Sequence, residues 1–166
     1  MTPEQGKLLA KVFIDTIQNE TETTKKVIRA VPEDKKEYKP DPKSMSANDL
    51  AWHLATSECW FLNGVVSGQF DMSGQAPAAP SSINGIVEWY ETNHGALLNQ
   101  LKDLPGDKLV KGIALFGPTE MPAVVYLNIL NLHSSHHRGQ LSAYLRPMGA
   151  KVPAIYGGSA DEPMQH

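Results

Sequence analysis

Four long segments of this chain repeat their apolar residues three or four positions apart, the spacing that places side chains along one face of an α-helix. The first segment follows Thr2-Pro3-Glu4-Gln5, a typical helix start in which Thr2 caps the helix and Gln5 closes a capping box. It extends to about Ala30. The others begin after Ser46, after Ser81 or Ser82, and near Pro122. The sequence therefore predicts an all-α four-helix bundle, a single domain over residues 1–166.

The segments between these helices are rich in residues that interrupt helices. Residues 31–43 hold three prolines and many charges, and residues 67–80 are rich in Gly, Ser, Ala and Pro, so both predict connections. Pro105-Gly106 ends the third helix. Residues 108–122 have short β-branched or aromatic pieces around two turn signals, which predicts either a small hairpin or an irregular crossover between helices three and four.

Composition excludes several classes of function. The formal net charge is −3, from 15 basic and 18 acidic residues interspersed along the chain, so no basic face is available to bind nucleic acid. The first twenty residues lack the apolar run of a signal peptide, and no stretch reaches the roughly eighteen apolar residues of a membrane span. We expect a soluble, cytoplasmic protein. Its one cysteine, Cys59, excludes an intrachain disulfide and a Cys-rich zinc site.

Two histidines on the last predicted helix have the spacing of metal ligands. His133 and His137 are four residues apart, which puts them about 40° apart around the helix and about 6 Å apart along it. Both imidazoles can therefore reach one ion. His136 lies about 100° away from His137, and the apolar stripe through Leu130 and Leu141 selects His137 as the ligand.

A third imidazole can come from His53, which lies on the apolar stripe of the second helix. Three histidines leave a coordination position open for water or substrate. A single histidine on an apolar face is usually a hydrogen-bonded core residue, but three uncharged imidazoles together need partners that a metal supplies. His94 falls on the inward stripe of the third helix. It can be a fourth ligand, a proton shuttle lining a pocket, or a core residue, and we favour pocket lining or core over ligation.

Other catalytic arrangements are disfavoured. In zinc proteases that use H-x-x-x-H, a glutamate follows the first histidine, whereas this chain has Ser134 there. The sequence has no G-x-S-x-G elbow, no phosphate-binding glycine loop and no dinucleotide fingerprint, and the two histidine helices lack the paired carboxylates of a di-iron bundle. Cys59 lies about 120° from His53 around its helix, so we expect a packed residue and not a nucleophile. The predicted site is mononuclear.

The run from His133 to Leu141 resembles the H-x-x-x-H-R-G-Q-L signature on the last helix of the DinB/YfiT-like metalloenzymes. His53, in Leu50-Ala51-Trp52-His53-Leu54, resembles that family's histidine on helix two, and the tail Pro153-Ala154-Ile155-Tyr156-Gly157 also resembles its members. The resemblance spans nearly the whole chain. It implies an up-down-down-up bundle, often a homodimer, with a divalent metal ion, often zinc or nickel, on His53, His133 and His137.

Characterised members of that family include thiol S-transferases that use bacillithiol or mycothiol and a mycothiol-dependent isomerase. The resemblance therefore implies a small-molecule substrate, with a low-molecular-weight thiol among the candidates. Arg138 and Gln140 match the signature, and each can either support a neighbouring ligand or pack the helix.

Three hypotheses about function follow. The first is a metal-dependent transferase or hydrolase in which the ion activates a thiol or water. The second is a non-catalytic metal-binding protein with a stress-related or structural role, and the third is a plain bundle whose histidines are core residues. Three imidazoles suit zinc, nickel, copper and iron(II), so the residues leave the metal open and assign no catalytic residue.

Overall fold

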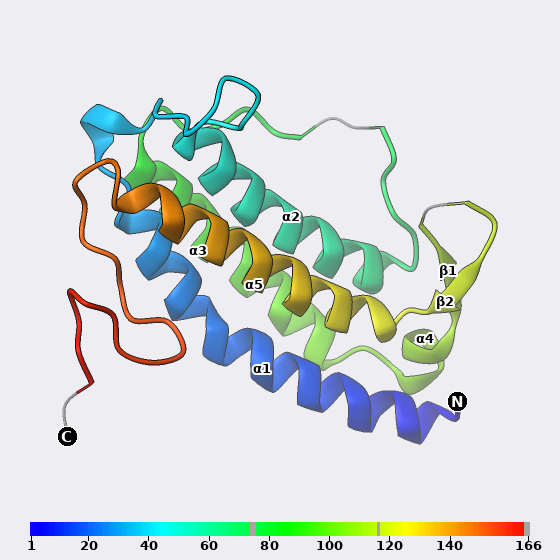
Figure 1. Ribbon diagram of the computed structural model, residues 1–166. Helices are drawn as coiled ribbons and strands as arrows, with labels where there is room; N and C mark the ends of the chain where they lie inside the picture. The colour runs from blue at the N-terminus through cyan, green and yellow to red at the C-terminus, as the bar shows by residue number, and fades with distance from the viewer. Residues whose placement is uncertain (74–75, 116, 165–166) are drawn as a thin grey trace.

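The computed structural model describes residues 1–73, 76–115 and 117–164, and it confirms the four-helix prediction (Figure 1). The four main helices are α1 (Pro3–Arg29), α2 (Ala47–Ser67), α3 (Ile83–Lys102) and α5 (Val125–Leu145). Between them lie the 3-10 helix η1 (Glu33–Lys35), the short helix α4 (Gly106–Val110) and the strands β1 (Gly112–Ala114) and β2 (Glu120–Pro122). No helix in the described ranges is long and apolar enough to cross a membrane.

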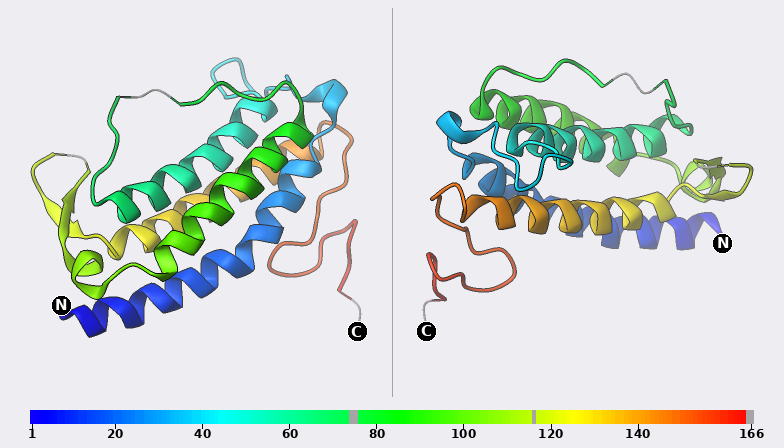
Figure 2. Two further views of the ribbon diagram at one scale, coloured as in Figure 1. Left: turned by 180° about the vertical axis from the view of Figure 1, so that it is seen from behind. Right: turned by 45° about the horizontal axis from the view of Figure 1, so that its top comes forward.

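The four main helices run up, down, down and up. In the views of Figures 1 and 2, α1 and α5 run in one direction while α2 and α3 run in the other. The chain returns along the length of the bundle between the parallel helices α2 and α3, in the connection whose described residues are 68–73 and 76–82. The connection from α3 to α5 stays at one end of the bundle and holds α4 and the hairpin.

The helix starts are those that the sequence predicts. The Thr2 hydroxyl accepts the Gln5 main-chain N–H, and the Gln5 side chain accepts the Thr2 N–H at 2.9 Å, which completes the capping box. The Ser46 hydroxyl caps α2. The choice left open for α3 is resolved in favour of Ser82 over Ser81, because the Ser82 hydroxyl accepts a main-chain N–H three residues further on.

The hairpin alternative for residues 108–122 is confirmed, and a short helix precedes it. Strands β1 and β2 pair antiparallel with Ile113 opposite Met121, and the Tyr126 hydroxyl on α5 donates to the Ile113 carbonyl oxygen at 2.7 Å. Helix α4 follows its N-cap Pro105 and buries Leu109. Five residues are too few for the helical spacing to be recognised in the sequence, so α4 was not predicted.

The core consists of two hydrophobic clusters separated along the bundle by a layer of buried polar side chains. On α2, for example, Leu54 belongs to one cluster and Leu62 to the other, with Glu58 between them. Each main helix contributes at least one residue to this polar layer, which contains Thr24, Glu58, His94, Ser134 and Arg138. Two of the predicted metal ligands, His133 and His137, lie at the same level of the bundle, between Leu130 and Leu141 on α5.

The end of α2 shapes one wall of the region beside the histidines. Gly68 adopts a left-handed conformation with φ of 78°, which ends the helix and turns the chain back. The Phe70 ring then packs directly on Gly64, so closely that a Cβ atom at position 64 would lie 2.2 Å from the ring. The Trp60 ring lies against Phe70, with centroids 4.7 Å apart.

Candidate metal centre

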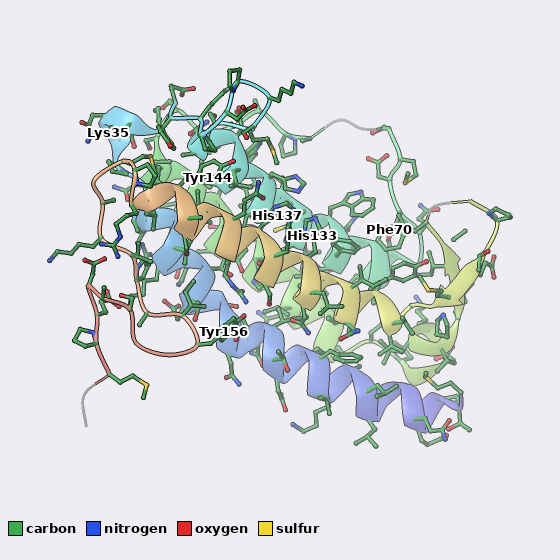
Figure 3. All side chains as sticks on the ribbon, viewed as in Figure 1. Lys35, Phe70, His133, His137, Tyr144 and Tyr156 are labelled. Carbon is green, nitrogen blue, oxygen red and sulfur yellow. The ribbon has the colours of Figure 1, made fainter. Side chains whose placement is uncertain are left out.

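The three predicted ligands come together between α2 and α5. The Nε2 atom of His137 lies 3.2 Å from Nε2 of His53 and 3.2 Å from Nε2 of His133, and the cluster's ligand atoms all lie within 4.8 Å of one another. Metal–nitrogen bonds of about 2.0–2.1 Å at tetrahedral angles place two ligand nitrogens about 3.3–3.4 Å apart. The spacing therefore fits one ion, and the cluster can hold a metal. Figure 3 labels two of its members, His133 and His137.

The second nitrogen of two of these rings has its own hydrogen-bond partner. Nδ1 of His137 lies 2.9 Å from Oε1 of Gln140, which can only accept from that nitrogen. Nδ1 of His133 lies 3.5 Å from the Ser57 hydroxyl, whose own hydrogen is donated to the Leu54 carbonyl. The His137 ring therefore carries its hydrogen on Nδ1 and presents a lone pair on Nε2 toward the centre of the cluster, and the Ser57 hydroxyl is placed to accept the corresponding hydrogen from His133.

The surroundings keep these imidazoles uncharged. Burial, and then the nearby His137, lower the pKa of His133 to about 4. Burial also lowers the pKa values of His53 and His137, although Gln140 opposes the shift at His137. A neutral imidazole is the form that binds a metal ion, so at neutral pH no proton has to leave before an ion binds.

The other two histidines considered as ligands lie elsewhere. His136 is exposed on α5, beside the cluster but outside it. His94 is buried on α3, where its ring stacks on Tyr90 at 4.5 Å and its Nε2 lies 3.2 Å from a Glu58 carboxylate oxygen. Of the three roles considered for His94, the structure supports that of a core residue.

Cys59 is a packed residue, as predicted. It is buried, and burial together with the charge of Glu58 raises the pKa of its thiol to about 12. A thiol that stays protonated at neutral pH is a poor nucleophile, so Cys59 has no place in the site chemistry.

The sequence reasoning missed a buried carboxylate at the centre of the polar layer. Glu58 accepts hydrogen bonds from the Tyr90 hydroxyl at 2.6 Å and the Thr24 hydroxyl at 3.3 Å. Burial alone would raise the pKa of Glu58, but the contacts with His94 and Tyr90 hold it below its ordinary value. The residue is therefore a buried anion. Its position four residues from Leu54 and Leu62, on the buried stripe, was the signal available in the sequence.

Arg138 extends the polar layer to α1 and to the C-terminal tail. Its buried guanidinium donates to the Thr24 hydroxyl at 2.9 Å and to the Tyr156 hydroxyl, and it pairs with the Glu20 carboxylate. Among the described contacts of Arg138, none is with a ring of the histidine cluster. Of the two roles considered for Arg138, the structure supports helix packing, whereas Gln140 contacts the predicted ligand His137 directly.

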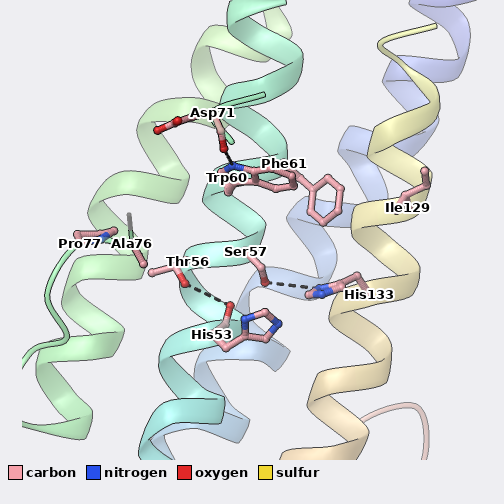
Figure 4. A pocket seen from close by; sticks show the side chains of 10 residues that line it. All are labelled: His53, Thr56, Ser57, Trp60, Phe61, Asp71, Ala76, Pro77, Ile129 and His133. Carbon is pink, nitrogen blue, oxygen red and sulfur yellow. Dashed lines mark hydrogen bonds between the residues drawn. The ribbon is translucent and has the colours of Figure 1, made fainter. Parts of the chain in front are cut away.

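A pocket of about 490 Å³ opens beside the histidine cluster (Figure 4). Its walls are mostly apolar, with the Trp60 and Phe61 rings on one side and Ile129 on another. Its lining residues are His53, Thr56, Ser57, Trp60, Phe61, Asp71, Ala76, Pro77, Ile129 and His133. Two of the three predicted ligands thus form part of a cavity large enough for a small molecule.

Comparison with known proteins identifies the family and the fold. The DinB family model matches residues 5–165. The uncharacterized protein YrdA of Bacillus subtilis strain 168 is 26% identical over 154 residues, which cover 90% of this chain and 89% of YrdA. The uncharacterized protein YjoA of the same organism is 28% identical over 127 residues, covering 76% of this chain and 82% of YjoA.

Two solved structures have the same architecture. A DinB-like protein from Bacillus cereus ATCC 10987 superposes with a TM-score of 0.74 at 26% identity, covering 87% of this chain and 95% of that protein. The structure of B. subtilis YjoA superposes with a TM-score of 0.73 at 24% identity, covering 86% of this chain and 96% of YjoA. Because the family model spans nearly the entire sequence and the fold agrees, this chain belongs to the DinB family.

Proposed function

We propose that this chain is a metal-dependent enzyme in which a divalent ion, zinc or nickel, binds to His53, His133 and His137. The observation that carries the proposal is the pocket, because it is lined by His53 and His133 themselves. A purely structural metal site is closed by four protein ligands, whereas a catalytic one keeps a position open toward a cavity. The arrangement here has three ligands and an adjoining cavity.

The residues around the cluster have separable tasks in such an enzyme. Gln140 and Ser57 orient the rings of His137 and His133 through their Nδ1 atoms. Trp60, Phe61 and Ile129 surround the space beside the cluster with apolar surface, which excludes water and holds a substrate. When bound, the ion would lower the pKa of a thiol or water and so supply a nucleophile at neutral pH. Thiol S-transfer and hydrolysis are the two reactions of this kind that we propose.

The test is turnover by protein reconstituted with zinc or with nickel. Each form is assayed with low-molecular-weight thiols plus electrophiles, and with hydrolysable esters and amides. We expect turnover in at least one assay. His137→Ala should lose both metal and turnover, and His136→Ala, one residue away on the exposed face, should keep both. Stoichiometric metal binding without turnover in any assay would contradict the enzyme proposal.

A second candidate is a non-catalytic protein in which the ion joins helices. It is favoured by one observation, the origin of the ligands on two helices, His53 on α2 and His133 on α5. Metal binding then contributes mainly to folding stability. In that case chelation should lower the melting temperature strongly while every activity assay stays negative, and elemental analysis should still find about one ion per chain.

A further inference from the structure

Three side-chain donors among the described residues of the pocket wall already have partners. The Thr56 hydroxyl donates to the Trp52 carbonyl at 2.8 Å, and the Ser57 hydroxyl donates to the Leu54 carbonyl at 3.2 Å. The Trp60 indole N–H donates to the Asp71 main-chain carbonyl at 2.9 Å. A carboxylate, phosphate or sulfonate on a ligand needs donors, and these three groups offer it none.

The rim of the pocket, where Asp71 lies, is negatively charged. No lysine or arginine is among the described residues that line the pocket, and the one carboxylate there is that of Asp71. Hydrogen bonds from Ser73 hold the pKa of Asp71 below its ordinary value, so the group is an anion at neutral pH. Figure 4 shows Asp71 and Trp60 at one end of the pocket and His53 and His133 at the other.

Trp60 adds a second attraction for a cation. Its indole ring lines the pocket, and its N–H donates to the main-chain carbonyl of Asp71, the residue that carries the rim carboxylate. An indole face attracts a positive charge through its quadrupole, and a neighbouring carboxylate acts in the same direction. The pocket thus combines an apolar body, hydrogen-bond acceptors and a negative rim.

We propose that this pocket binds a small molecule with an aromatic or similarly flat apolar body and a cationic amine, with the amine at the Asp71 rim. The proposal rests on the proposed function, because it assigns a substrate class to the same site. A reactive group at the opposite end of such a molecule lies next to His53 and His133. A carboxylate at the rim would instead meet a like charge, and the described hydroxyl and indole groups of the wall, Thr56, Ser57 and Trp60, have no free hydrogen to donate to it.

The test compares three probes that share one body: fluorobenzylammonium, fluorobenzyl alcohol and fluorobenzoate. Their dissociation constants are measured by fluorine NMR with metal-free protein at neutral pH, so that no ion attracts the carboxylate. We expect the ammonium probe to bind about three- to tenfold more tightly than the alcohol, a modest preference because Asp71 is solvent-exposed. The benzoate should bind most weakly.

Two variants test whether Asp71 causes the preference for the ammonium probe. Asp71→Asn should bring the ammonium probe to the affinity of the alcohol and leave the alcohol unchanged. Asp34→Asn, an exposed aspartate on η1 that does not line the pocket, should bind all three probes like the unaltered protein.

Three outcomes overturn the proposal: the benzoate binds as tightly as the ammonium probe, Asp71→Asn keeps the full ammonium preference, or no probe binds at millimolar concentration. These measurements use metal-free protein, so they are independent of turnover. An ammonium preference in a protein without metal-dependent activity would refute the enzyme proposal alone, and activity without the preference would refute only the substrate class.

Discussion

Gln140 lies one turn after His137 on α5, and its Oε1 atom is 2.9 Å from Nδ1 of that ring. The opposite ring nitrogen is 3.2 Å from Nε2 of His53 and also 3.2 Å from Nε2 of His133. His137 is therefore the ring that both other histidines of the cluster approach, and Gln140 determines which of its nitrogens carries the hydrogen. The glutamine acts on the whole cluster through one hydrogen bond.

Replacing Gln140 with Leu should weaken zinc binding about tenfold or more, because the ring loses the contact that sets its tautomer and orientation. Gln140→Glu should keep the affinity, since a carboxylate accepts the same hydrogen bond. Competition with a chromophoric chelator measures both. Gln100→Leu, on the exposed side of α3, is the control for added apolar surface. Equal affinities for Gln140→Leu and Gln100→Leu would exclude this role.

The histidine cluster could be predicted because helix geometry is local. The spacing of His133 and His137 determines their relative direction whatever surrounds the helix. His53 followed from the buried stripe of a second helix. The fold was predictable for the same reason, since four long periodic segments bounded by caps leave few alternatives to a bundle.

The polar layer and the outer pocket wall were harder to predict, for two different reasons. Glu58 occupies a buried position, but partners for its charge come from α1 and α3, and the sequence does not show that those helices meet at this level. Asp71 and Pro77 reach the pocket from the connection after α2, whose path depends on Phe70 packing on Gly64. A chain reversal of this kind leaves no periodic pattern in the sequence from which it could be predicted.

Glu58→Gln should lower the free energy of unfolding by about 1–3 kcal/mol, because the buried Tyr90 hydroxyl and His94 lose a charged partner. Urea denaturation of metal-free protein measures the change. Glu88→Gln makes the same chemical change at an exposed position of α3 and should leave the stability nearly unchanged. If the two variants are equally stable, Glu58 is not the charged centre of the polar layer.

Stability of the metal-free protein should fall as the pH is lowered through the range set by His133. Burial lowers the pKa of His133 to about 4 from an ordinary value of 6.5. Between these values the unfolded chain binds a proton that the folded protein excludes, so the free energy of unfolding decreases toward acid. Above pH 6.5 this residue contributes no pH dependence.

Urea denaturation in the presence of a chelator measures this dependence at a series of pH values. His133→Ala should make the dependence less steep between about pH 6.5 and 4, with His53 and His137 still contributing, whereas His136→Ala, at an exposed position, should follow the unaltered protein. A slope that His133→Ala leaves unchanged would mean that His133 keeps an ordinary pKa in the folded protein.

Gly64→Ala and Gly95→Ala should change stability in opposite directions, although both add one methyl group to a main helix. A Cβ at position 64 would lie 2.2 Å from the Phe70 ring, which must then move from its place beside Trp60. We expect a loss of about 1–3 kcal/mol and weaker probe binding in the pocket. A Cβ at position 95 meets no atom within 4 Å. Alanine there should stabilise α3 by about 0.5–1 kcal/mol.

Thermal and urea unfolding of the two glycine variants test whether Phe70 holds the pocket wall. If Gly64→Ala loses stability but binds the alcohol probe normally, the contact of Phe70 with Gly64 supports the core without shaping the pocket. If Gly64→Ala gains stability as Gly95→Ala does, Phe70 does not pack on α2 in solution. Only loss of both stability and probe affinity fits the packing of Phe70 on Gly64 and of Trp60 on Phe70.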